Sequence, residues 1–474
     1  MHHPFRKYPS RRACILLSLA LLVAGLLIKR HALDLSDALQ SSDRGRYVRP
    51  SSVDDCSDVP PLPLSSRGFA RACCTIYPQV FGKYRPAETP GLVSLLQSGD
   101  RYLRPWSYPR SFFEAGASSD RHYFFRHAFS ATETVYVVTP DLSAFVERFL
   151  RLPPTARVTL VTGSEDIGAP FEVFHPVNRT DYFDYNMAAL WPRGQPVGMR
   201  AFIRDPRLVM WYAQNYDLVG CNVYTCSDVD PSRPSDAALL AKVRPLPIGL
   251  DLHSLSEKVR GRRGDSETVE ALVCQQRQDL AKALASAGGR PFGERRLTVH
   301  AEFDCAFPSP KGRALRERSR GELCRLLERH KQDGRFSFAP AAPRPSHSSN
   351  SKSLRVGRMA FWSRVAACAF ALAPAGYGTD THRVWEVLQM RTVPVVLASP
   401  LDALYSDFPV VVVQRWADVF APGSLERFRD EVAAKWGRDP FSKQVLHRLT
   451  TDHWVRRVNS SRVLGLPPSW GGET

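Results

Sequence analysis

Alternation between apolar strands and helical segments predicts an α/β protein with parallel sheets. In the first half of the chain, β-branched runs at 134–139 and 157–162 flank a helical pattern over 142–150. In the second half, residues 370–396 combine an apolar strand, a glycine-containing turn, a short helix and a second apolar strand. Because 474 residues are enough for two ordinary domains, we expect a lobe in each half.

The order of these patterns divides the chain into a first lobe at 119–250, a connector at 251–295, a second lobe at 296–423 and C-terminal helices at 424–474. The first lobe is further predicted to contain a helix at 206–215 and strands at 217–220 and 243–248. The second lobe is predicted to contain strands at 296–303 and 409–413, helices at 313–330 and 356–367, and a surface loop at 339–352. Two amphipathic helices are predicted in the C-terminal part, at 425–436 and 443–458.

The N-terminus predicts a membrane anchor. Four basic residues within 1–12 precede an uninterrupted apolar run over 13–28, which ends at Lys29-Arg30-His31. The run is short, but the membranes of the early secretory pathway are thin enough for it. The heavier positive flank predicts a cytosolic tail at 1–12 and a lumenal location for the rest. A cleaved signal peptide is the main alternative, and a mitochondrial presequence is disfavoured because the run is not amphipathic.

The segment 29–118 is rich in Ser, Pro and Arg and lacks sustained periodicity, which predicts a stem followed by irregular chain. Of the ten cysteines, nine lie beyond the apolar run, so at least one lumenal thiol is unpaired or intermolecular. Their spacing fits no zinc site, and we predict no metal site. Asn178 and Asn459 begin glycosylation acceptor triplets that are usable only in the lumen.

The unit at 370–396 has the features of a nucleotide site. A strand that leads through a tight turn into a helix directs backbone N–H groups and the positive end of the helix dipole at an anionic ligand. Gly376 and Gly378 allow close backbone approach, and Asp380 or Thr381 can cap the helix. On that helix, a guanidinium at position 383 suits phosphate and a carboxylate at 386 suits a ribose diol. A surface Arg–Glu pair is the plainer interpretation.

The same unit resembles the exostosin-like glycosyltransferases. The pattern of that family is an apolar strand, Pro-x-Gly, Asp-x-x-Arg, a Glu three residues later and a strand with an Ile/Val-Pro-Val sequence. The corresponding residues here are Pro374, Gly376, Asp380, Arg383, Glu386 and Val393-Pro394-Val395. Upstream, 213–221 and 245–255 resemble the segments that join the two lobes in this family. The resemblance spans 134–419 and is strongest over 370–419.

This resemblance implies two facing Rossmann-like lobes of the GT-B type and a location in the Golgi or endoplasmic reticulum membrane. Members of the family are similar in using mostly UDP-sugars and in inverting the anomeric carbon. We therefore expect a single-pass type II glycosyltransferase that transfers a hexose or pentose from a nucleotide sugar to a glycan or glycoprotein acceptor. Both lobes would then contribute to catalysis.

In such a transfer, negative charge grows on the departing diphosphate, and preorganised donors have to meet it. The predicted donor-binding residues are Gly376, Gly378, Thr379, Asp380, Arg383 and Glu386, with Lys311, Arg313 and Arg316 as further donors from a neighbouring loop. A divalent cation becomes optional and no cofactor is required. Asp228-Val229-Asp230 lies in a Cys- and Pro-bounded loop and is interpreted as a turn rather than a metal motif.

Inversion needs a general base for the acceptor hydroxyl. Acidic residues beyond the carboxyl ends of the first lobe's strands are the candidates, because ligands bind at that edge of a parallel sheet. We favour Asp251 and Asp166, and Asp251 could equally cap the following helix. Asp141 is also possible, Glu165 lies at the same edge, and His253 and His382 are weaker options.

The formal charge of +17 fits acidic glycans and nucleotide diphosphates, and it would also suit nucleic acid or anionic lipid. No RNA-binding, zinc-finger or helix-turn-helix motif supports nucleic acid as a partner. A lumenal glycan-binding or assembly subunit that kept the fold without catalysis is the main alternative function, possible as a homo- or hetero-oligomer. A hydrolase or phosphate-transfer enzyme lacks support, because no Walker loop or nucleophile elbow is present.

Overall fold

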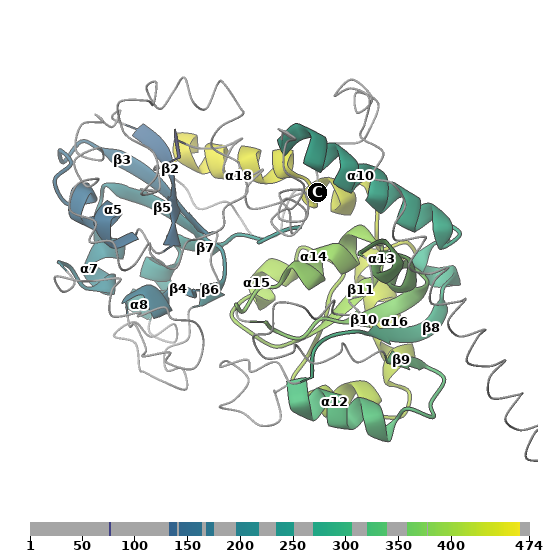
Figure 1. The fold of residues 1–474 in the computed structure, drawn as a ribbon. Helices are drawn as coiled ribbons and strands as arrows, with labels where there is room; N and C mark the ends of the chain where they lie inside the picture. The colour runs from purple at the N-terminus through teal and green to yellow at the C-terminus, as the bar shows by residue number, and fades with distance from the viewer. Residues whose placement is uncertain are drawn as a thin grey trace, which may run out of the picture. The chain divides into compact units, whose positions relative to one another are not determined.

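The computed structural model describes residues 75–76, 132–139, 142–163, 167–174, 196–217, 234–250, 269–305, 320–338, 358–376 and 378–464, all within one unit that spans Cys56–Thr474. Two parallel sheets form the framework, as the sequence predicted, and each contains five of the described strands (Figure 1). The predicted anchor and nearly all of the predicted stem lie outside the described residues. Within the described ranges, no helix is long and apolar enough to cross a membrane.

The first sheet has its strands in chain order, β1-β2-β3-β5-β7, and every neighbouring pair is parallel. The βαβ alternation predicted for this half is confirmed. The strands are β1 (Thr75–Ile76), β2 (Thr132–Val138), β3 (Arg157–Gly163), β5 (Leu208–Ala213) and β7 (Val243–Pro245). The helices are α5 (Leu142–Phe149), α6 (Phe171–Phe174), α7 (Met199–Arg204) and α8 (Pro234–Leu240), and a small parallel pair is made by β4 (Ala169–Pro170) and β6 (Tyr216–Asp217).

The helix predicted at 206–215 is wrong, because most of this segment forms strand β5. β5 lies between β3 and β7, and its residues are buried except for the half-buried Val209. A strand that is buried on both faces is apolar throughout and loses the alternation by which strands are recognised. A short apolar run of this kind is therefore easily mistaken for a buried helix.

The second sheet has the order β12-β11-β10-β8-β9, so its first strand, β8, lies between the second and the third. The chain runs outward from β8 to β9 and then returns to the other side of β8 to form β10. Of the two five-stranded sheets that the described strands form, only this one adds successive strands first on one side and then on the other. In open α/β sheets, ligands bind at the point where the strand order reverses in this way, the switch point. The strands are β8 (Arg296–Ala301), β9 (Phe336–Phe338), β10 (Cys368–Leu372), β11 (Val393–Leu397) and β12 (Val411–Val413).

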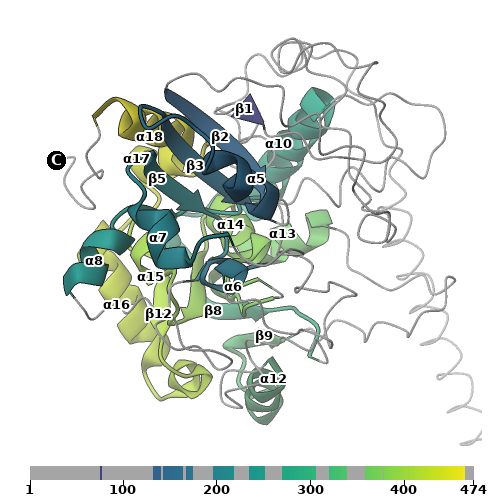
Figure 2. The same cartoon turned by 90° about the vertical axis from the view of Figure 1, so that its left-hand side faces the viewer.

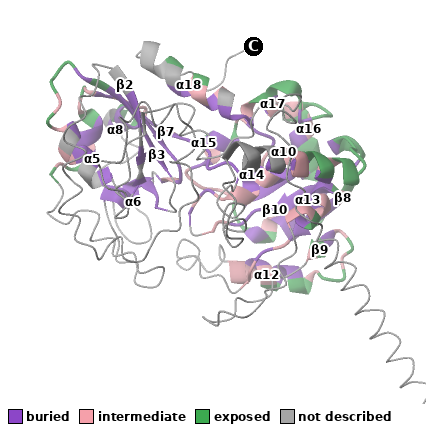
Figure 3. Cartoon of the chain, turned by 45° about the horizontal axis from the view of Figure 1, so that its top comes forward, coloured by how far each residue is buried: buried purple, intermediate pink, exposed green. Residues whose placement is uncertain are grey.

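The helices of the second half follow the predicted order, except that the short helix at Asp402–Tyr405 was not predicted. They are α10 (Val269–Ser286), α12 (Arg320–Arg329), α13 (Arg358–Ala366), α14 (His382–Gln389), α15 (Asp402–Tyr405) and α16 (Ser424–Trp436), with 3-10 turns η6 (Phe292–Glu294) and η8 (Trp416–Phe420). The single helix predicted at 443–458 is instead two helices, α17 (Lys443–Arg448) and α18 (Thr451–Leu464). In Figure 3 the strands of both sheets are almost entirely buried, whereas exposed residues gather on helices such as α10 and α16.

The first sheet is covered on one of its faces by the C-terminal helix α18, which contacts β2, β3 and β5 (Figures 1 and 2). Successive residues of β5 point to opposite faces. Trp211 packs into the first lobe's own core, while its neighbour Tyr212 belongs to the core that also contains Trp454 and Val458 of α18. That second core extends through the β8–β12 sheet, so the end of the chain joins the two halves.

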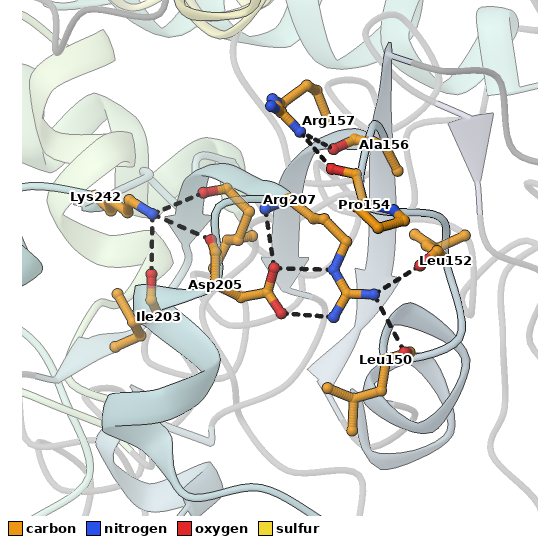
Figure 4. Close-up of polar contacts among 10 residues, drawn as sticks. Leu150, Leu152, Pro154, Ala156, Arg157, Ile203, Asp205, Arg207 and Lys242 are labelled. Atoms are coloured by element: carbon orange, nitrogen blue, oxygen red, sulfur yellow. Dashed lines mark hydrogen bonds and ion pairs between the residues drawn. The ribbon is translucent and has the colours of Figure 1, made fainter.

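Basic side chains bind backbone carbonyls at the amino edge of the first sheet (Figure 4). Lys242 donates three hydrogen bonds from Nζ, and Arg207 pairs with the Asp205 carboxylate while also reaching two carbonyls. Arg207 lowers the pKa of Asp205 through this hydrogen bond. The carbonyl acceptors are those of Ile203, Asp205 and Leu208 for Lys242, and of Leu150 and Leu152 for Arg207.

A buried arginine likewise binds backbone carbonyls at the amino edge of the second sheet. Arg295 precedes β8 and donates to the carbonyls of Arg290, Cys368 and Met390 and to the hydroxyl of Thr392. Burial lowers the pKa of Arg295 to about 10, which still leaves it charged at neutral pH. Part of the chain's positive charge thus joins segments at the edges opposite the carboxyl ends of the strands.

We predict that Trp454→Ala lowers the free energy of unfolding by about 3–5 kcal/mol, because a fully buried indole is removed from the core that α18 forms with the first sheet. Urea unfolding of the two proteins measures this difference. Arg456→Ala, at an exposed position of the same helix, is the control and should change stability by less than about 0.5 kcal/mol. Equal stability of the Trp454 variant and the parent would show that α18 does not cover the sheet.

Candidate functional site

The candidate site lies where the second sheet reverses direction. The segment after β8 begins at Glu302, and the segment after β10 runs from Ala373 through the turn to Thr381, where α14 begins. β8 and β10 are parallel neighbours, so both segments leave the same edge of the sheet. The strand–turn–helix–strand unit predicted from the sequence is confirmed, and it places the N-terminus of α14 at this edge.

Asp380 is buried, and its carboxylate accepts hydrogen bonds from three protein groups. Its carboxylate accepts the backbone N–H of Ile248 at 2.8 Å, the N–H of Thr381 at 2.8 Å and the indole N–H of Trp385 at 2.9 and 3.1 Å. Ile248 belongs to the segment after β7, so this carboxylate joins the two lobes. Burial raises the pKa of Asp380 to about 6, although these donors and His382 favour the charged form.

A second bond joins the turn to the first lobe at Asn215. The Asp380 N–H donates to Asn215 Oδ1 at 2.9 Å, and Asn215 has a φ of 51° in the turn between β5 and β6. Asparagine tolerates this left-handed conformation better than most residues. At Gly378, a Cβ atom would lie 2.7 Å from Asn215 Cγ, which is too close for any side chain. Gly378 thus permits close contact between the lobes.

Thr381 and His382 complete this junction. Thr381 occupies the N-cap position of α14 with φ −135° and ψ 143°, but its hydroxyl makes no capping bond, and the Asp380 carboxylate accepts the Thr381 N–H instead. His382 Nδ1 lies 2.6 Å from the carbonyl oxygen of Gly249. His382, predicted as a weak candidate for the base, therefore contacts the segment after β7.

Arg383 lies at the carboxyl end of β8. Its Nη1 donates to the Glu302 carbonyl at 2.7 Å, and its guanidinium lies 4.0 Å from the ring centre of Phe361 on α13. Among the described residues, Nε and Nη2 make no hydrogen bond. Burial lowers the pKa of Arg383, whereas Glu386 and Glu302 raise it, and the guanidinium stays charged at neutral pH. Two fixed, unused donors of this kind suit an oxyanion.

Glu386 lies on the same face of α14, as its spacing from Arg383 predicted. Its Oε1 is 4.0 Å from Arg358 Nε, too far for a hydrogen bond, and no hydrogen bond to its carboxylate is found in the described ranges, although its charge also acts on Arg383. The side chain is 12% exposed. Arg383 and Glu386 therefore bring a cation and a carboxylate with unused hydrogen-bonding capacity to one edge of the sheet.

A polar cluster of His300, Glu302 and Arg364 includes the residue whose carbonyl binds Arg383. The Glu302 carboxylate is 3.2 Å from His300 Nε2 and accepts a bond from Arg364 at 2.8 Å. Burial raises the pKa of Glu302, but the bonds with His300 and Arg364 outweigh it and hold the pKa below its ordinary value. The sequence pattern missed this cluster, because a His and a Glu two residues apart at the end of a strand show no distinctive spacing.

Arg320 on α12 is the basic residue that the structure places at the turn. Its Nε donates to the Ala375 carbonyl at 2.9 Å and its Nη2 to the Pro374 carbonyl at 3.5 Å. A Cβ added at Gly376 would lie 3.7 Å from the same guanidinium. The sequence had directed attention to the loop just before this helix, and Arg320 was missed because it lies in a helix rich in arginine.

Acidic residues also gather at the carboxyl edge of the first sheet. Gly168 lies between two buried side chains, and a Cβ there would be 2.9 Å from both Asp217 Oδ2 and Glu172 Oε2. Glu172 accepts the Gly168 N–H. These acids were not predicted, since each lies in a very short element without a motif.

Several predicted residues lie outside the described part of the chain. They are the candidate bases Asp141, Asp166, Asp251 and His253, the acidic Glu165, the basic loop residues Lys311, Arg313 and Arg316, the turn residues Asp228 and Asp230, and the glycosylation acceptor Asn178. Thr379 is described and half-buried beside Asp380. Asn459 lies within α18. Across the described ranges, no group of three or more His, Cys, Asp or Glu side chains could hold a metal ion.

No protein-family model matches the chain, and a search among curated proteins finds no match. The site itself is therefore the basis for inferring function. It places the guanidinium of Arg383 and the carboxylate of Glu386 on the helix that begins at this edge of the sheet.

Asp380 predicts a pH dependence of stability. Because its folded-state pKa lies at about 6 and its ordinary value is 3.8, the protonated form stabilises the fold at low pH, and this contribution is lost as the pH rises toward 6. In the Asp380→Asn variant the side chain stays neutral at every pH, so the variant does not lose this stability as the pH rises. Relative to the parent, the free energy of unfolding of the variant should rise by about 2 kcal/mol between pH 4 and pH 7 and stay level above.

Denaturant unfolding at a series of pH values measures this difference, and Asp430→Asn at an exposed position is the matched control. Subtraction of the parent's curve removes the contributions of other carboxylates, such as Glu302, whose lowered pKa acts in the opposite direction. A difference that does not vary with pH would show that Asp380 ionises like an exposed carboxylate.

Proposed function

We propose that this protein is a glycosyltransferase that binds a nucleotide sugar at the switch point of its second sheet. The observation that carries the proposal is the pairing of Arg383 and Glu386 on one face of α14, each with unused hydrogen-bonding capacity, at the carboxyl ends of β8 and β10. Arg383 would bind the diphosphate and Glu386 the ribose. The motif resemblance to exostosin-like glycosyltransferases supports the same assignment and the GT-B type of architecture.

The chemistry follows from where charge develops. As the bond between the anomeric carbon and the diphosphate oxygen breaks, the leaving group becomes more negative. Arg383 is held in place by the Glu302 carbonyl and the Phe361 ring, so it needs little rearrangement to meet this charge. The acceptor hydroxyl attacks from the opposite face and transfers its proton to a base, for which Asp251 and Asp166 stay the candidates. Asp251 follows directly on the segment that bonds to Asp380 and His382.

The wider proposal is a single-pass type II protein of the Golgi or endoplasmic reticulum membrane that transfers a sugar, preferably from a UDP-sugar, to a glycan or glycoprotein with inversion. The Cys305–Cys324 disulfide is compatible with an oxidising lumen. The main alternative is a two-lobe glycan-binding subunit without catalysis. Gly378 and Asp380 suit it as well, because both motif residues contact Asn215 of the first lobe and so join the lobes without any catalytic role. Turnover of a nucleotide sugar by the parent protein separates the two functions.

We predict that Arg383→Ala lowers kcat by at least about tenfold, equivalent to roughly 1.4 kcal/mol of transition-state stabilisation, because the guanidinium matters more as charge develops. Glu386→Gln should mainly raise the KM for the donor, since it weakens acceptance of hydrogen bonds from the ribose. A panel of nucleotide sugars identifies the donor, and release of nucleoside diphosphate measures the rates. Both variants should stay folded, because Trp385 and Leu388 anchor α14 in the core.

The matched controls are Arg429→Ala and Glu431→Gln, both at exposed positions of α16. Each should leave kcat and KM unchanged. If the parent transfers sugar and both α14 variants do so equally well, α14 is not the donor site. If the parent binds a nucleotide sugar without turnover, the protein is a binding subunit and the transferase proposal fails.

We also predict that a chelator leaves nucleotide binding largely intact, because the helix N-terminus and Arg383 supply the positive charge that a metal would otherwise contribute. Calorimetric titration of UDP with and without EDTA measures this, and the Kd should change by less than about threefold, or 0.6 kcal/mol. Asp228→Ala combined with Asp230→Ala should likewise change activity little. Complete loss of binding in chelator, restored by a divalent cation, would place the charge-stabilising group elsewhere.

A further inference from the structure

The turn between β10 and α14 is held at its start by an arginine from another helix. Arg320, the first residue of α12, donates to the successive carbonyls of Pro374 and Ala375. Because a trans peptide unit is planar, the direction of a carbonyl also determines the direction of the N–H that follows it. Two bonds from one planar guanidinium therefore orient two successive peptide units.

A disulfide holds α12 beside this turn. It joins Cys305, in the segment that follows β8, to Cys324 on α12, with 5.9 Å between their Cα atoms. Cys324 lies four residues after Arg320, so both are on one face of the helix. The neighbouring Leu323 and Leu327 are buried in the core of the second sheet. The segment after β8 is thus covalently tied to the helix whose first residue holds the segment after β10.

The other end of the turn is held independently. The Asp380 carboxylate accepts a hydrogen bond from the Ile248 N–H, and the Asp380 N–H donates one to Asn215. Helix α14, which carries Arg383, begins two residues later. Arg320 is the counterpart of these bonds at the start of the turn. The turn is thus bonded to other elements of the protein near its start, at Pro374 and Ala375, and near its end, at Asp380.

We propose that Arg320, braced by the Cys305–Cys324 disulfide, is a positioning residue for a nucleoside diphosphate bound at the switch point. The proposal rests on the function proposed above. Arg320 acts through the backbone of the turn, which it orients by its bonds to Pro374 and Ala375. Stabilisation of a departing diphosphate depends on donors that are already in place, so loosening the turn should impair transfer more than donor binding.

Three variants of the full-length chain test this proposal. Arg320→Ala removes both bonds, and Arg320→Lys keeps the charge without the planar fork that reaches two carbonyls. Cys305→Ser combined with Cys324→Ser removes the brace and keeps Arg320. The control is Arg325→Ala, on the same helix, whose exposed guanidinium pairs with Glu322.

Two readouts are needed. Hydrogen exchange, measured by mass spectrometry on peptides that cover 373–381, should be at least fivefold faster in Arg320→Ala and in the double Ser variant, and intermediate in Arg320→Lys. With the donor that the parent accepts, kcat should fall at least fivefold in Arg320→Ala, while the KM changes less than twofold. Arg325→Ala should match the parent in both measurements. Thermal unfolding verifies that each variant is folded. If Arg320→Ala does not fold, the Arg320→Lys and double Ser variants still test the proposal.

Unchanged exchange in 373–381 would overturn the proposal, and so would a fall in kcat no larger than that of Arg325→Ala. An effect on KM alone would also overturn it, because Arg320 would then contribute to ground-state binding only. These outcomes leave the transferase function standing when the parent is active. If the parent neither binds nor uses any nucleotide sugar, the transferase function fails, and the positioning role fails with it.

Discussion

The architecture depends on one buried carboxylate. Asp380 accepts hydrogen bonds from Ile248 after the first sheet and from Thr381 and Trp385 at the start of α14, so a single side chain connects both lobes to the helix of the candidate site. Burial of a carboxylate is costly and raises its pKa, and the surrounding donors only partly offset the cost. Removing this carboxylate would leave three N–H donors, those of Ile248, Thr381 and Trp385, without their acceptor.

This constraint divides the motif between two tasks. Gly378 and Asp380 bring the lobes together, with Asn215 as their partner in the first lobe. Arg383 and Glu386, three and six residues after Asp380, keep unused hydrogen-bonding groups at the edge of the sheet. A short stretch of chain therefore joins the lobes and presents the candidate site at once, so the position of the site depends directly on the contact between the lobes.

Positive charge is also divided. Lys242 and Arg207 bind carbonyls at the amino edge of the first sheet, and Arg295 does so in the second. Arg383 and Arg320 lie at the opposite edge of the second sheet, where β8 and β10 end. Net charge alone thus says little about ligands, because cations such as Lys242, Arg207 and Arg295 donate hydrogen bonds to backbone carbonyls. The location of a cation relative to the strand ends distinguishes a structural arginine from one that can meet an anion.

The sequence by itself determined the α/β class, the strand–turn–helix–strand unit and the shared face of Arg383 and Glu386, because these features depend on local periodicity and on turn residues. It did not reveal that the segment around Trp211 is a strand, since a strand buried on both faces has no alternation. Only the tertiary structure decided the strand order that creates the switch point, the contact of Asp380 with Ile248, and the approach of Arg320 to Ala375. The two contacts join residues 55 or more positions apart, and the strand order depends on how the whole sheet packs. No local sequence pattern encodes such pairings.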